Sequence, residues 1–114
     1  MSTSQGPAGV WDIQLTRPGQ TYPGVFTFTP TGVARTGDGA VGTWWKTNGE
    51  NSKFSFRMES NLKNPEGEPV GTLQMNQTAT LDGDTFESSG IHYVFGLEGE
   101  QVAEVEAQIT GKRR

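Results

Sequence analysis

Apolar and polar residues alternate with a period of two along much of this chain, and no stretch keeps the 3.6-residue period of an amphipathic helix. The pattern is clearest in residues 53–59, where Phe54, Phe56 and Met58 alternate with polar residues. Successive side chains of a strand point to opposite faces, so such segments predict strands with one apolar face. The sequence therefore predicts an all-β fold.

Eight segments carry the strand pattern, and turn sequences such as Asp38-Gly39, Asn48-Gly49 and Asp82-Gly83 separate them. The expected strands are residues 10–16, 24–29, 33–36, 40–46, 53–59, 70–81, 85–95 and 101–110, with a polar loop over residues 61–69. No helical crossover lies between them, so neighbouring strands are expected to pair antiparallel. Closure of such a sheet removes its exposed edges. We predict an eight-stranded up-and-down antiparallel β-barrel, a size that encloses packed side chains or one small ligand.

Residues 85–95 do not fit a single alternation. Phe86 and His92 share one parity, whereas Ile91, Tyr93 and Phe95 share the other. A β-bulge near residues 88–90 would switch the parity and re-aim the side chains after it. An apolar outer face in a subunit interface would explain the same pattern.

Composition sets the limits of this fold. The length of 114 residues suits one domain, expected over residues 9–114 after a disordered leader of residues 1–8. Only 32% of residues are apolar, so Trp, Phe and Tyr must supply most of the burial. A net charge of −4 argues against a general nucleic-acid binder. The chain has no cysteine and no apolar segment long enough for a membrane helix, which favours a cytoplasmic protein.

The start of the first predicted strand is Gly9-Val10-Trp11, a G-x-W sequence that resembles the opening motif of the lipocalins and their calycin relatives. In those families the Trp packs at the closed end of the barrel, and an Arg of the last strand lies across it. Arg113 shares parity with the inward Ile109, and in a closed barrel the last strand ends beside the start of the first. The resemblance therefore implies that Arg113 covers Trp11 in a cation–π contact worth about 0.5–2 kcal/mol.

Further short motifs strengthen the resemblance. The sequences FTFTPTG, GTWW, TATLDGDTF and ITGKR are similar to those of small lipocalin-like proteins of soil bacteria. The resemblance spans residues 9–113 and implies a barrel that holds a small molecule. Other barrels of this size act as cofactor-free cyclases in natural-product pathways, including [4+2] cyclases, which is an analogy at the level of the fold.

Residues of the inward parity, together with a few polar groups, are the candidate lining of a ligand pocket. The candidates are Tyr22, Phe28, Trp44, Phe56, Met58, Met75, Gln77, His92 and Tyr93. Gln77 lies within an apolar run, so its amide is expected to bond either a ligand or a neighbouring side chain. Tyr22 is expected in a loop at the mouth of the barrel. His92 is the only histidine, and its alternatives are a pocket contact, a haem ligand or a wall residue without a role.

The predicted function is the binding of a small, largely apolar organic molecule, such as a secondary-metabolite intermediate. The alternative is a cofactor-independent cyclase or isomerase that holds a reactive conformer in the same cavity. A third interpretation is a packed interaction module without a ligand. The sequence shows no acid–base pair and no nucleophile with a base, so no catalytic residue, cofactor or metal is assigned. A homodimer through outward aromatic residues such as Trp45 is a further expectation.

Overall fold

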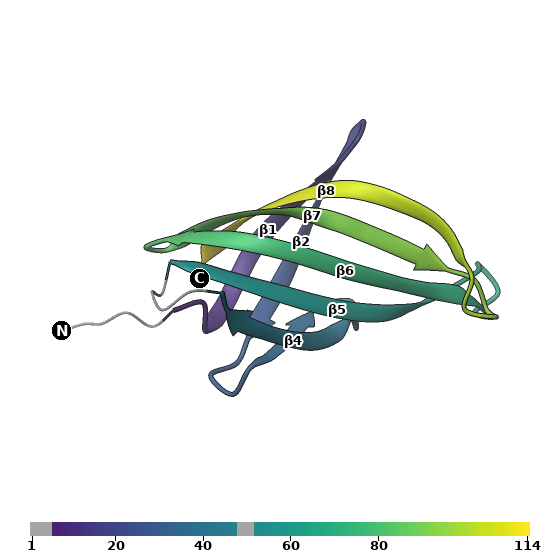
Figure 1. Cartoon of the computed structure of the whole chain (residues 1–114), viewed down its shortest axis with the longest axis horizontal. Helices are drawn as coiled ribbons and strands as arrows, with labels where there is room; N and C mark the ends of the chain where they lie inside the picture. The colour runs from purple at the N-terminus through teal and green to yellow at the C-terminus, as the bar shows by residue number, and fades with distance from the viewer. Residues whose placement is uncertain (1–5, 48–51) are drawn as a thin grey trace.

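The computed structural model describes residues 6–47 and 52–114, which form a closed barrel of eight antiparallel strands (Figure 1). Each strand pairs with its sequence neighbours, and the last strand returns to pair with the first. The strands are β1 (Gly9–Arg17), β2 (Gln20–Phe28), β3 (Val33–Thr36), β4 (Val41–Lys46), β5 (Lys53–Lys63), β6 (Pro69–Asp82), β7 (Thr85–Phe95) and β8 (Gln101–Arg113). The predicted all-β, up-and-down barrel is confirmed. Leader residues 1–5 and the predicted turn at Asn48-Gly49 lie outside the described residues.

Burial follows the alternation that predicted the strands. In β1, Trp11, Ile13 and Leu15 are buried while Asp12 and Gln14 are exposed. The apolar core of the barrel consists of Trp11, Ile13, Leu15, Phe26, Phe28, Ala34, Ala40, Phe54, Phe56, Met58, Met75, Ala79, Phe86, Ala107 and Ile109. Aromatic rings make up much of this core, as the small apolar fraction of the sequence requires.

Several strands are longer than the sequence predicted. β2 begins at Gln20, so Tyr22 belongs to a strand and not to a loop. β5 runs to Lys63 and β6 starts at Pro69, which reduces the predicted loop over residues 61–69 to a tight turn. In that turn the Asn64 side-chain oxygen accepts hydrogen bonds from the backbone N–H groups of Glu66 and Glu68, at 3.0 and 2.9 Å. Strand ends with solvent on both faces show no apolar alternation, which is why sequence reasoning missed them.

Of the two explanations given for residues 85–95, the β-bulge near residues 88–90 is wrong. β7 keeps one register with β6 from Thr85 to Phe95, and its register with β8 shifts only between Val94 and Phe95. Gly90 lets β7 lie close to β6, because a Cβ added at this position would overlap the backbone carbonyl of Asn76. Without a bulge, the residues before and after Gly90 keep the same alternation between the inner and outer faces. The apolar residues of the other parity, Ile91, Tyr93 and Phe95, are half-buried on the outer face.

The strands differ strongly in length, and this shapes the barrel. β3 and β4 have 4 and 6 residues, whereas β6 and β8 have 14 and 13. β3 pairs with β2 only from Phe26 to Phe28, and β4 pairs with β5 only as far as Glu59. No described strand therefore lies between the first half of β2 and the last part of β5. In Figure 1, β5 to β8 form a long sheet that extends past β4, in a molecule of 50 × 29 × 23 Å.

Candidate functional site

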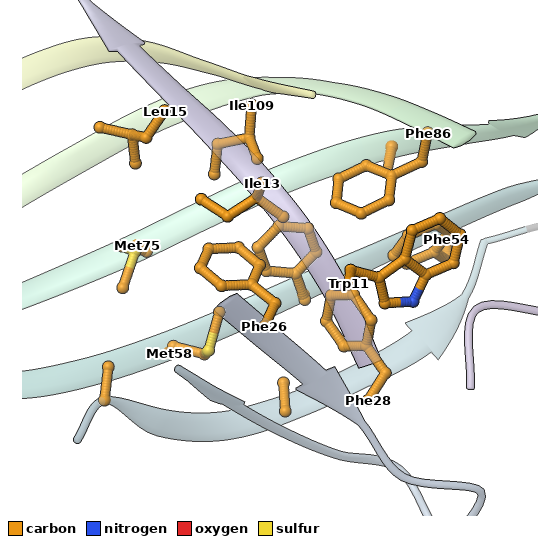
Figure 2. Packing of buried hydrophobic residues seen from close by; sticks show 14 residues of the cluster. Trp11, Ile13, Leu15, Phe26, Phe28, Phe54, Met58, Met75, Phe86 and Ile109 are labelled. Atoms are coloured by element: carbon orange, nitrogen blue, oxygen red, sulfur yellow. The ribbon is translucent and has the colours of Figure 1, made fainter. Parts of the chain in front are cut away.

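One end of the barrel interior is closed by aromatic rings. Phe28 lies at the centre, with ring centroids 5.2 Å from Phe56, 5.5 Å from Phe54 and 6.2 Å from Phe86. Trp11 packs edge-on against Phe86 at 5.0 Å. Figure 2 shows the rings of Trp11, Phe28, Phe54 and Phe86 on one side of the view, with Leu15 and Met75 on the opposite side. Such edge-to-face packing leaves no room for a ligand here.

The chain ends seal this aromatic end. The guanidinium carbon of Arg113 lies 4.4 Å from the centroid of the Trp11 ring, as the resemblance implied. Arg113 also donates hydrogen bonds to the carbonyls of Gly6 and Ala8 and pairs with Asp84 at 3.1 Å. The Trp11 ring nitrogen donates to the Pro7 carbonyl at 2.8 Å. Residues 6–8, predicted as part of a disordered leader, are thus an ordered cap on the barrel.

Four of the predicted lining residues belong to this packed end or to the core beside it. Phe28, Phe56 and Met58 are each 1% exposed or less. Trp44 is half-buried, and its ring nitrogen donates a hydrogen bond to the Thr29 carbonyl at 2.7 Å. The inward parity placed these residues inside the barrel, but it did not reveal which end of the interior is filled.

A cleft of about 660 Å³ opens in the wall of the barrel near the other end, between the β1–β2 hairpin and β6. The cleft lies where the short β3 and β4 leave the first half of β2 without a second partner. Its apolar lining includes Ile13, Leu15, Phe26, Leu73 and Met75, and its polar lining includes Arg17, Tyr22 and Asp38. Met75 and Tyr22 are the two predicted lining residues that the structure brings to this cleft. Its volume falls in the range of about 300–1,000 Å³ that is usual for small-molecule sites.

Beside the cleft, three polar side chains of β6 and β7 are buried in the interior. Gln77 is 3% exposed, Ser88 6% and His92 1%. Ser88 donates a hydrogen bond from its hydroxyl to the Gln77 side-chain oxygen at 2.8 Å. The Gln77 amide nitrogen lies 2.9 Å from His92 Nε2 and donates to the Ala107 carbonyl at 3.3 Å. His92 is paired across the sheet with Met75, which lines the cleft, so this polar cluster adjoins the cleft directly.

These contacts fix the orientation of the Gln77 amide and the tautomer of His92. The Ala107 carbonyl can only accept a hydrogen bond, so the Gln77 atom next to it must be the amide nitrogen. That nitrogen can only donate, so His92 Nε2 accepts and the proton of the neutral imidazole lies on Nδ1. Within residues 6–47 and 52–114, this Nδ1–H has no hydrogen-bond partner.

Arg17 is the functional candidate that sequence reasoning missed. It lies at the end of β1 in the inward parity of Leu15, lines the cleft, and has its guanidinium carbon 5.7 Å from the centroid of the Tyr22 ring. Its Nε is buried and, among the described residues, has no acceptor. Burial, and secondly the positive charge of Arg17, lower the pKa of His92 from 6.5 to about 4. His92 is therefore neutral near pH 7.

The remaining predicted lining residue, Tyr93, points away from the others. It lies on the outer face of β7 and borders a shallow depression of about 480 Å³ together with Trp45, Arg57 and Ile91. Tyr93 does not join His92, because the predicted bulge that would have turned it inward does not exist. Trp45 is 47% exposed, on the outer face as expected.

The described residues hold no group of three or more His, Cys, Asp or Glu side chains arranged to bind a metal ion. Across the same part of the chain, no helix is long and apolar enough to cross a membrane. No protein-family model matches the sequence, and no curated protein matches it either.

Proposed function

We propose that this protein binds a small, largely apolar organic molecule in the cleft between the β1–β2 hairpin and β6. The observation that carries the proposal is the cleft of about 660 Å³ with an apolar lining that includes Leu15, Leu73 and Met75, next to buried polar groups. Apolar walls with a few placed polar groups are the usual composition of a ligand site. The up-and-down barrel and the contact of Arg113 with Trp11 support a relationship to lipocalin-like barrels.

The direct test uses the neutral apolar dye N-phenyl-1-naphthylamine, whose fluorescence rises in apolar surroundings. We expect saturable binding of one dye per chain. Leu73→Trp places a larger side chain in the cleft, and it should weaken dye binding by about tenfold or more, the equivalent of about 1.4 kcal/mol. Thr80→Trp is the matched control, because Thr80 is exposed on the same strand.

The two variants must first be shown to keep the circular dichroism spectrum of the barrel. The proposed site would be contradicted if the unmodified protein bound no dye. It would also be contradicted if Leu73→Trp and Thr80→Trp weakened dye binding equally. Native mass spectrometry of the purified protein supplies an independent measurement, since a bound apolar molecule adds its mass to the chain.

One observation favours the alternative of a cofactor-free cyclase or isomerase. His92 holds a buried donor, Nδ1–H, that no described residue uses, and such a group can hold a carbonyl of a reactive conformer. Cyclisation by this route changes the structure of the molecule but not its mass. Conversion of a co-purifying molecule into an isomer of different chromatographic retention would support this activity, and its unchanged recovery would support binding alone.

A further inference from the structure

The cleft and the polar cluster beside it contain two buried hydrogen-bond donors that have no acceptor among the described residues. One donor is Nε–H of Arg17 and the other is Nδ1–H of His92. Buried polar groups are paired in the great majority of folded proteins, and a buried donor without an acceptor is costly. Two such donors near one another mark a place where an acceptor from outside the chain is expected.

The positions of the two residues bring these donors to the same part of the interior. The pairing of β1 with β8 ends at Thr16 and Gln108. Arg17 follows Thr16 on β1 and Ala107 precedes Gln108 on β8, so both residues lie at this end of the strand pair. Ala107 is opposite Gly90 on β7, and His92 is the next inward residue along that strand. Burial is the larger cause of the lowered pKa of His92, and the positive charge of Arg17 is the second.

The charge of Arg17 has no counter-ion among the described residues. The ion pairs of the structure involve Arg57, Arg113 and Arg114, and none of them includes Arg17. Asp38, the carboxylate that borders the cleft, is exposed and accepts a hydrogen bond from Thr36. A half-buried guanidinium beside apolar walls attracts an anion that also has an apolar body.

We propose that the natural ligand is an apolar organic acid, whose carboxylate accepts hydrogen bonds from Arg17 and His92 while its hydrocarbon part lies on Leu15, Leu73 and Met75. This inference rests on the proposed function and narrows its class of ligand. Gln77 and Ser88 touch no ligand in this arrangement. They are positioning residues, because their hydrogen bonds hold the His92 ring with Nδ1–H free.

The test compares decanoate with decan-1-ol, which share a chain length and differ in the charged head group. At pH 7, isothermal titration calorimetry should give decanoate an affinity about tenfold or more above that of the alcohol, as expected for a charge-assisted hydrogen bond. Arg17→Met should remove this advantage, so that decanoate and decan-1-ol bind the variant with similar affinity. Arg35→Met is the matched control, because Arg35 is exposed on β3 away from the cleft, and it should keep the preference.

The single histidine of the chain supplies a second readout. In ¹⁵N NMR spectra, decanoate should shift the Nδ1–H resonance of His92 and raise the pKa of its imidazole, because a bound carboxylate offsets the charge of Arg17. Decan-1-ol should leave that pKa unchanged. A structural role of Arg17 alone predicts no such difference between the two compounds.

Four results would overturn the inference. Equal affinity for acid and alcohol, or an acid preference that survives in Arg17→Met, removes the carboxylate subsite and leaves the proposed apolar cleft intact. Binding of the neutral dye without any binding of decanoate has the same meaning. Failure of the dye, the acid and the alcohol together overturns the proposed function as well.

Discussion

The two ends of the barrel interior are built from the same alternation and differ in what fills them. At the closed end, contacting rings from β1, β2, β5 and β7 have centroids 5.0–6.4 Å apart, and the chain ends form a cap. At the other end, short β3 and β4 leave a cleft, and the interior contains Gln77, Ser88, His92 and Arg17. Strand length, more than residue type, therefore decides which part of the interior is core and which part is accessible.

The largest expected effect is at the closed end. Trp11→Ala should lower the free energy of unfolding by about 3–5 kcal/mol, because it leaves a cavity in packed surroundings. Leu15→Ala, at the cleft, should cost no more than about 2 kcal/mol, because that side chain already borders open space. Urea unfolding of both variants measures the difference. Similar losses at the two sites would show that the two ends are equally packed.

The next effect is the pH dependence of the polar cluster. In the unfolded chain His92 takes up a proton near pH 6.5, whereas in the folded barrel it does so only near pH 4. Its contribution to stability is therefore fully present above pH 6.5 and is lost as the pH falls from 6.5 to 4. The loss is at most about 3–4 kcal/mol, since one pKa unit corresponds to about 1.4 kcal/mol.

Unfolding free energies of the protein and of His92→Gln between pH 4 and 7 measure this contribution. Exposed carboxylates titrate in both proteins, so the difference between the two pH profiles isolates the histidine. Parallel profiles would mean that the His92 imidazole is solvated in the folded state and that the end of the barrel near the cleft is wetter than the structure shows.

The smallest effect is expected outside the barrel. Trp45→Ser should change the unfolding free energy by no more than about 0.5 kcal/mol, because nearly half of this side chain is already in solvent. It should also leave the binding of N-phenyl-1-naphthylamine unchanged, since Trp45 borders the outer depression and not the cleft. Calorimetry and the dye titration check both points. A large loss of either would indicate that the outer face belongs to the site or to an interface between subunits.

Sequence reasoning succeeded where one face of a strand is buried along its length. The alternation of Phe54, Phe56 and Met58 identified β5 and its inward face. The resemblance to lipocalins implied the contact of Arg113 with Trp11, and the parity of Arg113 agreed with it. It failed at strand ends, where solvent lies on both sides. Tyr22 was placed in a loop for that reason, although it belongs to β2.

The candidate site was harder to predict because its residues follow no apolar pattern. Arg17 precedes Pro18-Gly19, a turn signal that hid its place in β1. Its parity with Trp11, Ile13 and Leu15 was the signal that could have identified it. Ser88 shares the inward parity of Phe86, but its role could not be predicted from parity alone. It depends on the hydrogen bond that the Ser88 hydroxyl donates to Gln77 on the neighbouring strand.

The pairing of β1 with β8 places Trp11 next to Arg113, two residues about as far apart in the sequence as this chain permits. During synthesis on the ribosome, the first strand is made long before its second partner exists. The hairpins β1–β2 and β5–β6 can form early, but the seam of the barrel can close only after β8 has left the exit tunnel. Until then β1 presents an unpaired edge, so the nascent protein is exposed to aggregation at its first strand for most of its translation.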